Sequence, residues 1–115
     1  MSKSCLNSTA KEQVRIELKE YIPSESELEA TAEIFSVFGD VTRLKIISAL
    51  LIRELCVCEI AASLHLSDSA ISHQLKLLKQ ARLVKHRRAS NKIYYSLDDE
   101  HIEHIFAEGL KHVRE

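Results

Sequence analysis

ELCVCEIAASLHLSDSAISHQLKLLKQARLV, residues 54–84, is the segment from which the fold of this chain can be inferred. It predicts two short helices, residues 58–64 and 68–80, joined by a turn at residues 65–66. Ser67 is well placed to cap the second helix, because its hydroxyl can accept a hydrogen bond from a free backbone N–H of the first turn. A shared apolar core is expected from Leu64, Leu66, Ile71, Leu75 and Leu78. The polar residues of the second helix are left outward, which is the pattern of a helix-turn-helix.

The pattern of apolar residues changes after this pair of helices. VKHRR (84–88) and KIYYSL (92–97) are short runs on either side of residues 89–91, and the second run is rich in aromatic and β-branched residues. These features predict a β-hairpin whose outward side chains are mostly basic. A helix-turn-helix with such a hairpin and a last helix predicts a mainly α protein with a small β-hairpin, the arrangement called a winged helix-turn-helix.

The N-terminal part is expected to be helical as well. Ser8 or Thr9 could cap a helix through AKEQVRIELKEYI, and Pro23 ends it because the residue before a proline avoids the helical conformation. The chain then divides into an N-terminal arm with a short helix, residues 1–23, and a winged helix-turn-helix domain, residues 24–115.

Two further helices precede the helix-turn-helix. Ser24 and Glu27 form a capping box, in which each side chain reaches a free backbone N–H of the other's turn. The helix that follows stops at Gly39. Asp40 can cap the next helix, VTRLKIISALLIRE, and Arg43 lies one turn into it, where it could pair with Asp40.

The composition is that of one helical domain. The chain has 115 residues with two glycines and one proline, too few for the turns of an all-β fold. Its three cysteines are an odd number, which rules out a fully paired disulfide framework and favours a reducing cytoplasm. No apolar run approaches the roughly 18 residues of a membrane span. No Gly-rich loop or H-E-x-x-H motif points to an enzyme.

A net charge of −1 conceals a strongly uneven distribution. Between Ser69 and Leu97 there is no acidic residue, and the seven basic ones are Lys76, Lys79, Arg82, Lys85, Arg87, Arg88 and Lys92. A basic block between acidic ends indicates a surface that binds a polyanion. The second helix of the helix-turn-helix could read base edges in the major groove through its Ser, His and Gln side chains. Arg87, Arg88 and Lys92 at the hairpin tip suit phosphate or minor-groove contact.

Two cysteines, Cys56 and Cys58, form a C-x-C pair, and the third, Cys5, lies far away in the arm. Thiolates at this spacing bind soft or borderline metals, but two ligands are too few for a site. Cys5 would make three, enough for a trigonal site for lead, cadmium or arsenite. The pair could also be packing material, because buried free cysteine is common in protein cores.

The last residues, DDEHIEHIFAEGLKHVRE, predict one amphipathic helix with an apolar stripe of Ile102, Ile105, Phe106, Leu110 and Val113. His101 and His112 return to nearly one face of this helix, but they lie about 16 Å apart along its axis. Zinc binds its ligands at about 2 Å, so both histidines cannot serve one ion within one helix. An antiparallel second copy of the helix would bring together the two ends of a ligand set, which comprises Asp99, His101, His112 and Glu115.

A local arrangement is the alternative on the same helix. His104, Glu108 and His112 fall at i, i+4 and i+8, so neighbouring pairs could clamp an ion within one chain. These side chains could equally be ordinary solvated residues of a polar helix face. The residues alone leave the three possibilities open.

Together these motifs resemble the ArsR/SmtB family of winged-helix metal-sensing repressors, and the likeness runs from about Glu29 onward. ELCVCEIA is similar to the family's ELCVCDLA box, and SDSAISHQLKLLKQARLVKHRR is similar to its recognition helix and first wing strand. The last helix matches the family pattern D-x-H-x10-H-x-x-E/H at Asp99, His101, His112 and Glu115. The family's base-reading positions are occupied by Ser69, Ser72, His73 and Gln74, with Lys76 beside them on the outward face.

The resemblance implies a homodimer, paired through its terminal helices, that represses transcription by binding double-stranded operator DNA when it is metal-free. Zinc binding would release the DNA and so control genes for metal efflux or sequestration. Two sites are implied: an interfacial one on the final helices, and a thiolate one that joins Cys56 and Cys58 to the other subunit's arm. Cadmium, lead and cobalt are further candidate ions.

The arm departs from the family pattern, because it supplies Cys5 alone and no histidine. The thiolate site is therefore three-sulfur or incomplete, which favours lead or cadmium over zinc. Arsenite-responsive members carry a third cysteine three places after the pair, and that position is Ala61 here. The alternative function is an arsenite- or redox-responsive repressor that acts through Cys56 and Cys58 with Cys5.

Overall fold

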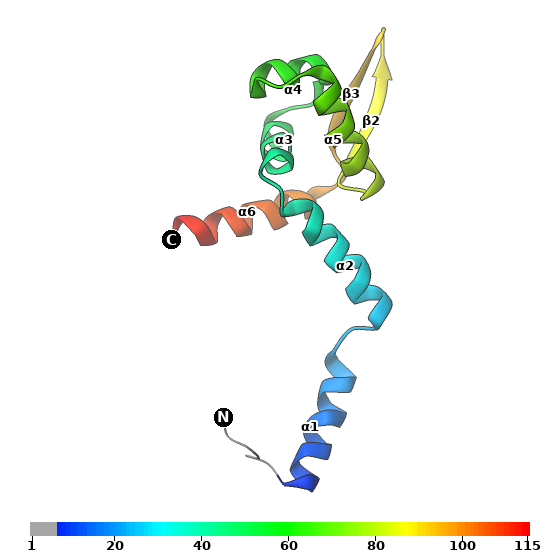
Figure 1. The fold of residues 1–115 in the computed structure, drawn as a ribbon, viewed down its shortest axis with the longest axis vertical. Helices are drawn as coiled ribbons and strands as arrows, with labels where there is room; N and C mark the ends of the chain where they lie inside the picture. Colours follow the sequence, from blue (N-terminus) through cyan, green and yellow to red (C-terminus); the bar gives the residue numbers. More distant parts are fainter. Residues whose placement is uncertain (1–6) are drawn as a thin grey trace. The chain divides into compact units, whose positions relative to one another are not determined.

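The computed structural model describes residues 7–115 (Figure 1). Its elements in chain order are α1 (Ser8–Tyr21), α2 (Glu25–Phe38), α3 (Val41–Ile52), β1 (Leu55–Cys56), α4 (Val57–Leu64), α5 (Asp68–Gln80), β2 (Val84–Ala89), β3 (Lys92–Leu97) and α6 (Glu100–Arg114). The chain divides into two compact units, Met1–Thr31 and Ala32–Glu115. The predicted domain division after residue 23 stays a prediction.

The first unit contains α1 and the beginning of α2. Asn7 caps α1, because its Oδ1 accepts a 2.7 Å hydrogen bond from the backbone N–H of Ala10. The prediction of Ser8 or Thr9 as the cap was therefore wrong, since both are already helical. The capping box of α2 is confirmed: Glu27 N–H donates to Ser24 Oγ at 3.2 Å, and Ser24 N–H donates to Glu27 Oε1 at 3.0 Å.

The second unit is built around a single apolar core. Its buried members are Phe38, Ile46, Ile47, Leu50, Ile60, Ala61, Ile71, Leu75, Leu78, Leu83, Val84 and Ile102. Of the residues expected in the core, Ile71, Leu75 and Leu78 are buried and Leu64 is half-buried. Leu66 is the exception, with 39% of its surface exposed. It lies in the turn after α4, where the backbone has left the helix and no longer directs the side chain inward.

The helix-turn-helix is formed by α4 and α5, and the limits of α5 are those predicted from the sequence. His65 makes the turn by adopting a left-handed conformation, with φ 58° and ψ 43°. Ser67 caps α5, because its Oγ accepts a 3.1 Å hydrogen bond from Ala70 N–H. A polar side chain and a left-handed turn residue thus set the start of α5, as local capping chemistry requires.

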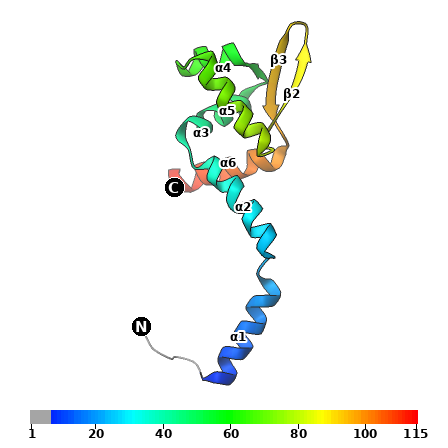
Figure 2. The same ribbon diagram turned by 45° about the vertical axis from the view of Figure 1, so that its right-hand side comes forward.

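The predicted hairpin is confirmed as β2 and β3, with a turn at residues 90–91, and it lies beside α5 (Figure 2). Ser90, at φ 57°, is the turn residue in the left-handed conformation. The structure adds a strand that the sequence did not predict: β1 pairs antiparallel with β3, which gives the order β1-β3-β2. A two-residue strand has no periodicity of its own, so its partner in β3 is what defines it.

The predicted last helix is confirmed as α6, and it begins after Asp99, which caps it. Ile102 is buried and Phe106 and Leu110 are half-buried, whereas Val113 is 80% exposed. The apolar stripe therefore covers the core only near the start of the helix. None of the helices within residues 7–115 is both long enough and apolar enough to span a membrane.

Candidate nucleic-acid interface and metal ligands

The reading helix, α5, presents a polar face to solvent. Its inner face is anchored by Ile71, Leu75 and Leu78, none of which has any exposed surface. The exposed side carries Ser69, Ser72, His73 and Lys76. A helix of 13 residues is about 20 Å long, and a helix of this diameter fits the major groove of B-DNA.

Gln74 differs from these four residues because it is half-buried and already bonded. Its Oε1 accepts a 2.9 Å hydrogen bond from Nε of Arg43 in α3. Arg43 was expected to pair with Asp40. The predicted Asp40 cap is confirmed, because Asp40 Oδ2 accepts a 3.0 Å hydrogen bond from the backbone N–H of Arg43, but the Arg43 guanidinium reaches α5 instead. The carboxylate is used on a free helix N–H, as N-cap residues generally are.

The wing, β2 and β3, carries its basic residues in two different environments. Arg88 and Lys92 are exposed next to the turn. Arg87 is bound instead to Glu54, through contacts of 2.8 Å from Nε to Oε2 and 2.6 Å from Nη2 to Oε1. The hydrogen bond from Arg87 lowers the pKa of the Glu54 carboxyl, and the same contact raises the pKa of Arg87. Both groups are therefore charged across the physiological range.

The cysteine pair lies at the start of α4, with the two Sγ atoms 3.4 Å apart. Two thiolates bound to one tetrahedral zinc at about 2.3 Å each would be about 3.8 Å apart, so the pair fits a shared ion. Cys56 is 4% exposed and Cys58 is open to solvent. The third expected thiolate, Cys5, lies outside the described residues.

Cys56 also has a structural task, since it is the N-cap of α4. Its backbone N–H donates a 2.9 Å hydrogen bond to Oε1 of Glu59, and this bond lowers the pKa of the Glu59 carboxyl. Burial raises the pKa of the Cys56 thiol. A metal ion would have to displace a proton held at this position, as thiolate sites generally require.

Asp99 and His101 lie together at the start of α6. Asp99 Oδ1 accepts hydrogen bonds from the backbone N–H groups of His101 and Ile102, at 2.8 and 3.4 Å, and lies 3.3 Å from His101 Nδ1. Partial burial opposes ionisation of Asp99, but these hydrogen bonds outweigh it and lower its pKa. An ionised carboxylate beside an exposed imidazole is a suitable half-site for zinc.

The other expected ligands are not brought to this half-site within one chain. His112 and Glu115 lie at the far end of α6, about 16 Å away by helix rise. Over residues 7–115, no three His, Cys, Asp or Glu side chains are grouped so that they could hold a metal ion. Each candidate set is therefore incomplete in the described part of a single chain. The local alternative, a clamp by neighbouring pairs among His104, Glu108 and His112, stays a prediction.

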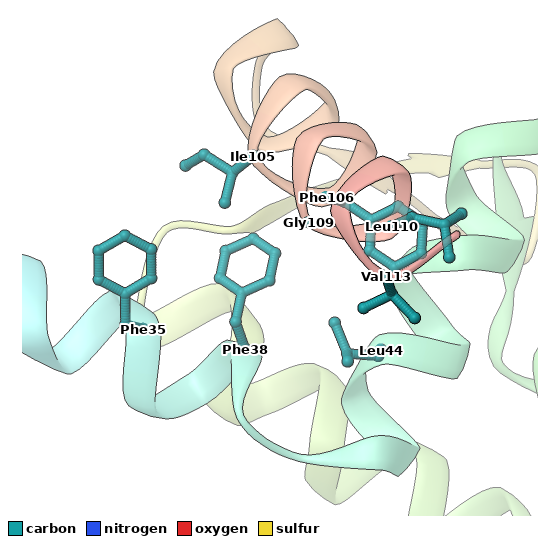
Figure 3. A pocket seen from close by; sticks show the side chains of 8 residues that line it. All are labelled: Phe35, Phe38, Leu44, Ile105, Phe106, Gly109, Leu110 and Val113. Atoms are coloured by element: carbon teal, nitrogen blue, oxygen red, sulfur yellow. The ribbon is translucent and has the colours of Figure 1, made fainter. Parts of the chain in front are cut away.

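An open apolar groove of about 390 Å³ lies between α6, the end of α2 and the start of α3 (Figure 3). Its lining residues are Phe35, Phe38, Leu44, Ile105, Phe106, Gly109, Leu110 and Val113. Figure 3 shows Phe35 and Phe38 projecting from α2 toward α6. On α6 the groove is lined by residues 105–113, which lie between Asp99 and His101 at the start of the helix and Glu115 at its end.

Glu54 and the link from Arg43 to Gln74 were missed by the sequence interpretation. Glu54 alternates with Cys56, which places both on one face of a strand. That signal is visible only once residues 55–56 are recognised as a strand, whereas Glu54 had been expected at the end of the preceding helix.

A helix-turn-helix whose reading helix is flanked by a basic wing defines a class of DNA-binding transcriptional regulators. A family model described as "Bacterial regulatory protein, arsR family" matches residues 40–86. The chain belongs to this family. It is an ArsR/SmtB-type transcriptional repressor and not an enzyme.

Individual relatives agree with this assignment. The chain is 43% identical over 104 residues to a "Transcriptional repressor SmtB homolog" of Synechocystis sp., covering 90% of the chain and 78% of the relative. It is 40% identical over 85 residues to a "Cadmium resistance transcriptional regulatory protein CadC homolog" of Staphylococcus aureus, covering 73% and 70%. A homodimeric winged helix-turn-helix DNA-binding domain from Mycobacterium bovis superposes with a TM-score of 0.75 at 25% identity, covering 82% of this chain and 90% of that domain.

Proposed function

We propose that this repressor senses a metal ion: the metal-free homodimer binds operator DNA, and zinc or a related ion releases it. The genes controlled would then be those for metal efflux or sequestration. The observation that carries the proposal is the placement of four ligands at opposite ends of one helix, with Asp99 and His101 at its start and His112 and Glu115 at its end. The name of the cadmium-resistance relative supports a metal as the signal.

A second copy of the chain is the partner that would complete this ligand set. Val113, Phe35 and Ile105 are 80%, 57% and 37% exposed in one chain, and burying such surface contributes about 25 cal/mol per Å². Gly109 supports a close helix crossing on this face. Glycine costs a helix about 1 kcal/mol relative to alanine. Nothing in the described part of the chain packs within 4 Å of the position its Cβ would take, so contacts within one chain do not require a glycine here, whereas a second helix crossing closely would.

Antiparallel packing of two α6 helices would create two equivalent sites. Each would combine Asp99 and His101 of one protomer with His112 and Glu115 of the other. Two imidazoles and two carboxylates form a donor set suited to zinc or cobalt. An ion bound there would cross-link the two helices. Residues of the protein would fix the position of the ion: Asp99 is held by two backbone N–H groups, which orient the Asp99 carboxylate before any ion arrives.

The DNA contacts would come from the reading helix and the wing. The proposed set comprises Ser69, Ser72, His73, Gln74 and Lys76 on α5, and Arg88 and Lys92 on the wing, where Arg87 lies beside them bound to Glu54. Metal binding would favour a dimer in which the two reading helices no longer match successive major grooves. By linkage, the metal then weakens DNA binding by the same factor by which DNA weakens metal binding. A coupling of about 3 kcal/mol corresponds to roughly a hundredfold change in operator affinity.

The test is a His101→Ala, His112→Ala double variant, assayed by fluorescence anisotropy on a duplex selected from a random pool by the metal-free protein. We expect its metal-free affinity to stay within about threefold of wild type. Zinc should weaken DNA binding about a hundredfold in wild type and have little effect on the variant. Unimpaired zinc release would overturn the interfacial site.

His104→Ala, Glu108→Gln is the matched control on the same helix. It removes the local alternative and leaves the four interfacial ligands in place, so zinc should still release the DNA. If release is lost in this control and kept in the first variant, the ion is clamped within one helix and the interfacial assignment fails.

The 3.4 Å separation of the two Sγ atoms favours a second sensing chemistry, through Cys56 and Cys58. Cadmium or lead could bind there with Cys5 of the partner, or the thiols could respond to arsenite or to oxidation. A Cys56→Ser, Cys58→Ser variant should lose thiolate-to-metal absorption with cadmium and lead but keep zinc release. If an oxidant does not change the operator affinity of wild type, the redox version fails.

A further inference from the structure

Arg87 contacts both Tyr94 and Glu54 across the sheet. In the strand register Cys56 faces Tyr94 and Tyr94 faces Arg87, so Cys56, Tyr94 and Arg87 lie in one row across β1, β3 and β2. Glu54 is two residues before Cys56 and therefore on the same side of the extended chain. Directly opposite residues share a face of a sheet. On that face the Arg87 guanidinium lies 5.3 Å from the Tyr94 ring centroid and reaches Glu54. The arginine thus spans the middle strand.

The contacts of Arg87 fix the orientation of its guanidinium. Both hydrogen bonds to Glu54 are short and run in parallel, which is the fork-to-carboxylate geometry of a strong, directional ion pair. The Tyr94 ring supports the cation from below. To contact a DNA phosphate, Arg87 would have to leave this pair, and Glu54 would then face the polyanion with its charge uncompensated.

Arg88 and Lys92 stand in contrast to Arg87. Both are exposed next to the turn, and neither side chain makes a hydrogen bond to any residue in the range 7–115. Their ammonium and guanidinium groups are free to follow a phosphate backbone. The basic residues of the wing therefore divide into one that is bound within the protein and two that are available.

We propose that Arg87 is a positioning residue for DNA binding: paired with Glu54, it ties the outer strand β2 to the segment just before β1 and so fixes the wing, while Arg88 and Lys92 contact phosphate. The inference refines the DNA-binding part of the proposed function and rests on it. A two-stranded hairpin is marginally stable by itself, and β1 adds only two residues to the sheet. An ion pair that crosses the middle strand, β3, is well placed to hold the hairpin.

The two roles predict opposite results for Glu54→Gln, which keeps the shape of the side chain and removes its charge. A positioning pair predicts operator binding about fivefold weaker. A phosphate-contacting Arg87 predicts tighter binding, because a competing anion has been removed. Arg87→Lys separates the roles again: lysine keeps the charge but cannot form the fork. It should therefore weaken binding as much as Glu54→Gln, and a lysine that restores wild-type affinity would overturn the proposal.

Salt dependence supplies the second readout. The slope of log K against log[salt] is negative, and loss of one phosphate contact makes it shallower by about 0.9. The variant Glu54→Gln, Arg87→Gln should keep the wild-type slope and bind no more weakly than the weaker single variant. The matched control Arg88→Gln should make the slope shallower by about one. If the slope became shallower by the same amount in the Glu54→Gln, Arg87→Gln variant and in Arg88→Gln, the assignment would be overturned.

Hydrogen exchange of the free protein tests the pair without DNA. Glu54→Gln should speed exchange of the β2 and β3 amides at least threefold and leave α5 unchanged. Unchanged exchange in the hairpin would overturn the proposal. If wild type showed no salt-dependent DNA binding, the proposed function would fail, and hairpin exchange would still decide whether Glu54 holds the wing.

Discussion

Arg43 Nε lies 2.9 Å from Gln74 Oε1, and this hydrogen bond joins α3 to the reading helix across 31 positions of sequence. Because the guanidinium has only donors, the oxygen of the Gln74 amide must face it. The amide is thus held at a fixed orientation on the half-buried edge of α5. The core helix α3 thereby contributes to the surface that reads DNA.

Arg43→Ala should weaken operator binding about tenfold, although Arg43 does not lie on the reading helix. In the Arg43→Ala background we expect Gln74→Ala to reduce operator affinity little further, with a coupling of about 1 kcal/mol in a double-mutant cycle. Anisotropy titrations of the four proteins measure this. Lys45→Ala, an exposed change on the same helix, should stay within about twofold of wild type; simple additivity of the two losses would show that the bond has no role in DNA binding.

Val113→Asp should convert the proposed dimer to monomers. An unpaired carboxylate in an apolar interface costs several kcal/mol, so the dimer dissociation constant should rise by at least about a hundredfold. Sedimentation velocity at several concentrations gives the result. Ile52→Asp is the matched control, because Ile52 is 81% exposed and Val113 is 80% exposed, but Ile52 does not line the groove. Equal effects of the two changes would contradict the assignment of this face.

Ser67→Ala should lower the free energy of unfolding by about 1 kcal/mol, because α5 loses the oxygen that accepts the Ala70 N–H. Urea unfolding followed by circular dichroism measures the change. Ser63→Ala serves as the control, since Ser63 Oγ only donates to the Glu59 carbonyl inside α4. It should change stability by less than about 0.5 kcal/mol. A control as costly as the cap change would mean that capping is not what sets the start of α5.

The capping box of α2 should make stability depend on acid. The hydrogen bonds from Ser24 hold the pKa of Glu27 below its ordinary value of 4.5. The folded state therefore binds this proton less readily than the unfolded state. The stabilisation is fully present above the ordinary pKa and is lost as the pH falls through the lowered one. Thermal unfolding of wild type and Glu27→Gln should differ at pH 7 and converge in acid, below the lowered pKa of Glu27; a constant difference would assign the effect to something other than charge.

Much of the fold was predictable because its signals are local. The limits of α5, the Ser67 cap, the Ser24 capping box and the hairpin each depend on residues within four or five positions of one another. Apolar spacing and capping chemistry act over that range. The cap of α1 was misplaced because neighbouring Asn, Ser and Thr residues are equally competent, and only the path of the backbone selects Asn7.

The parts that were not predicted depend on long-range contacts. β1 exists only through its partner strand, and Glu54 meets Arg87 across 33 positions. Arg43 had two possible partners, and the nearer one in sequence was taken by a backbone N–H. Such choices are made by the packing of α3, α4 and the sheet around one core, which sequence spacing does not encode.

Residue identity and spacing alone defined the chemistry of this repressor: a polar reading helix, a basic wing, a C-x-C pair and a helix with candidate metal ligands at both ends. They could do so because helix period and donor type are local properties. The tertiary structure alone decided which charges are free. It bound Arg87 to Glu54 and Gln74 to Arg43, set the two Sγ atoms 3.4 Å apart, and left an apolar groove beside the face of α6 between its two ligand pairs. Contacts between distant segments of one folded chain govern each of these outcomes.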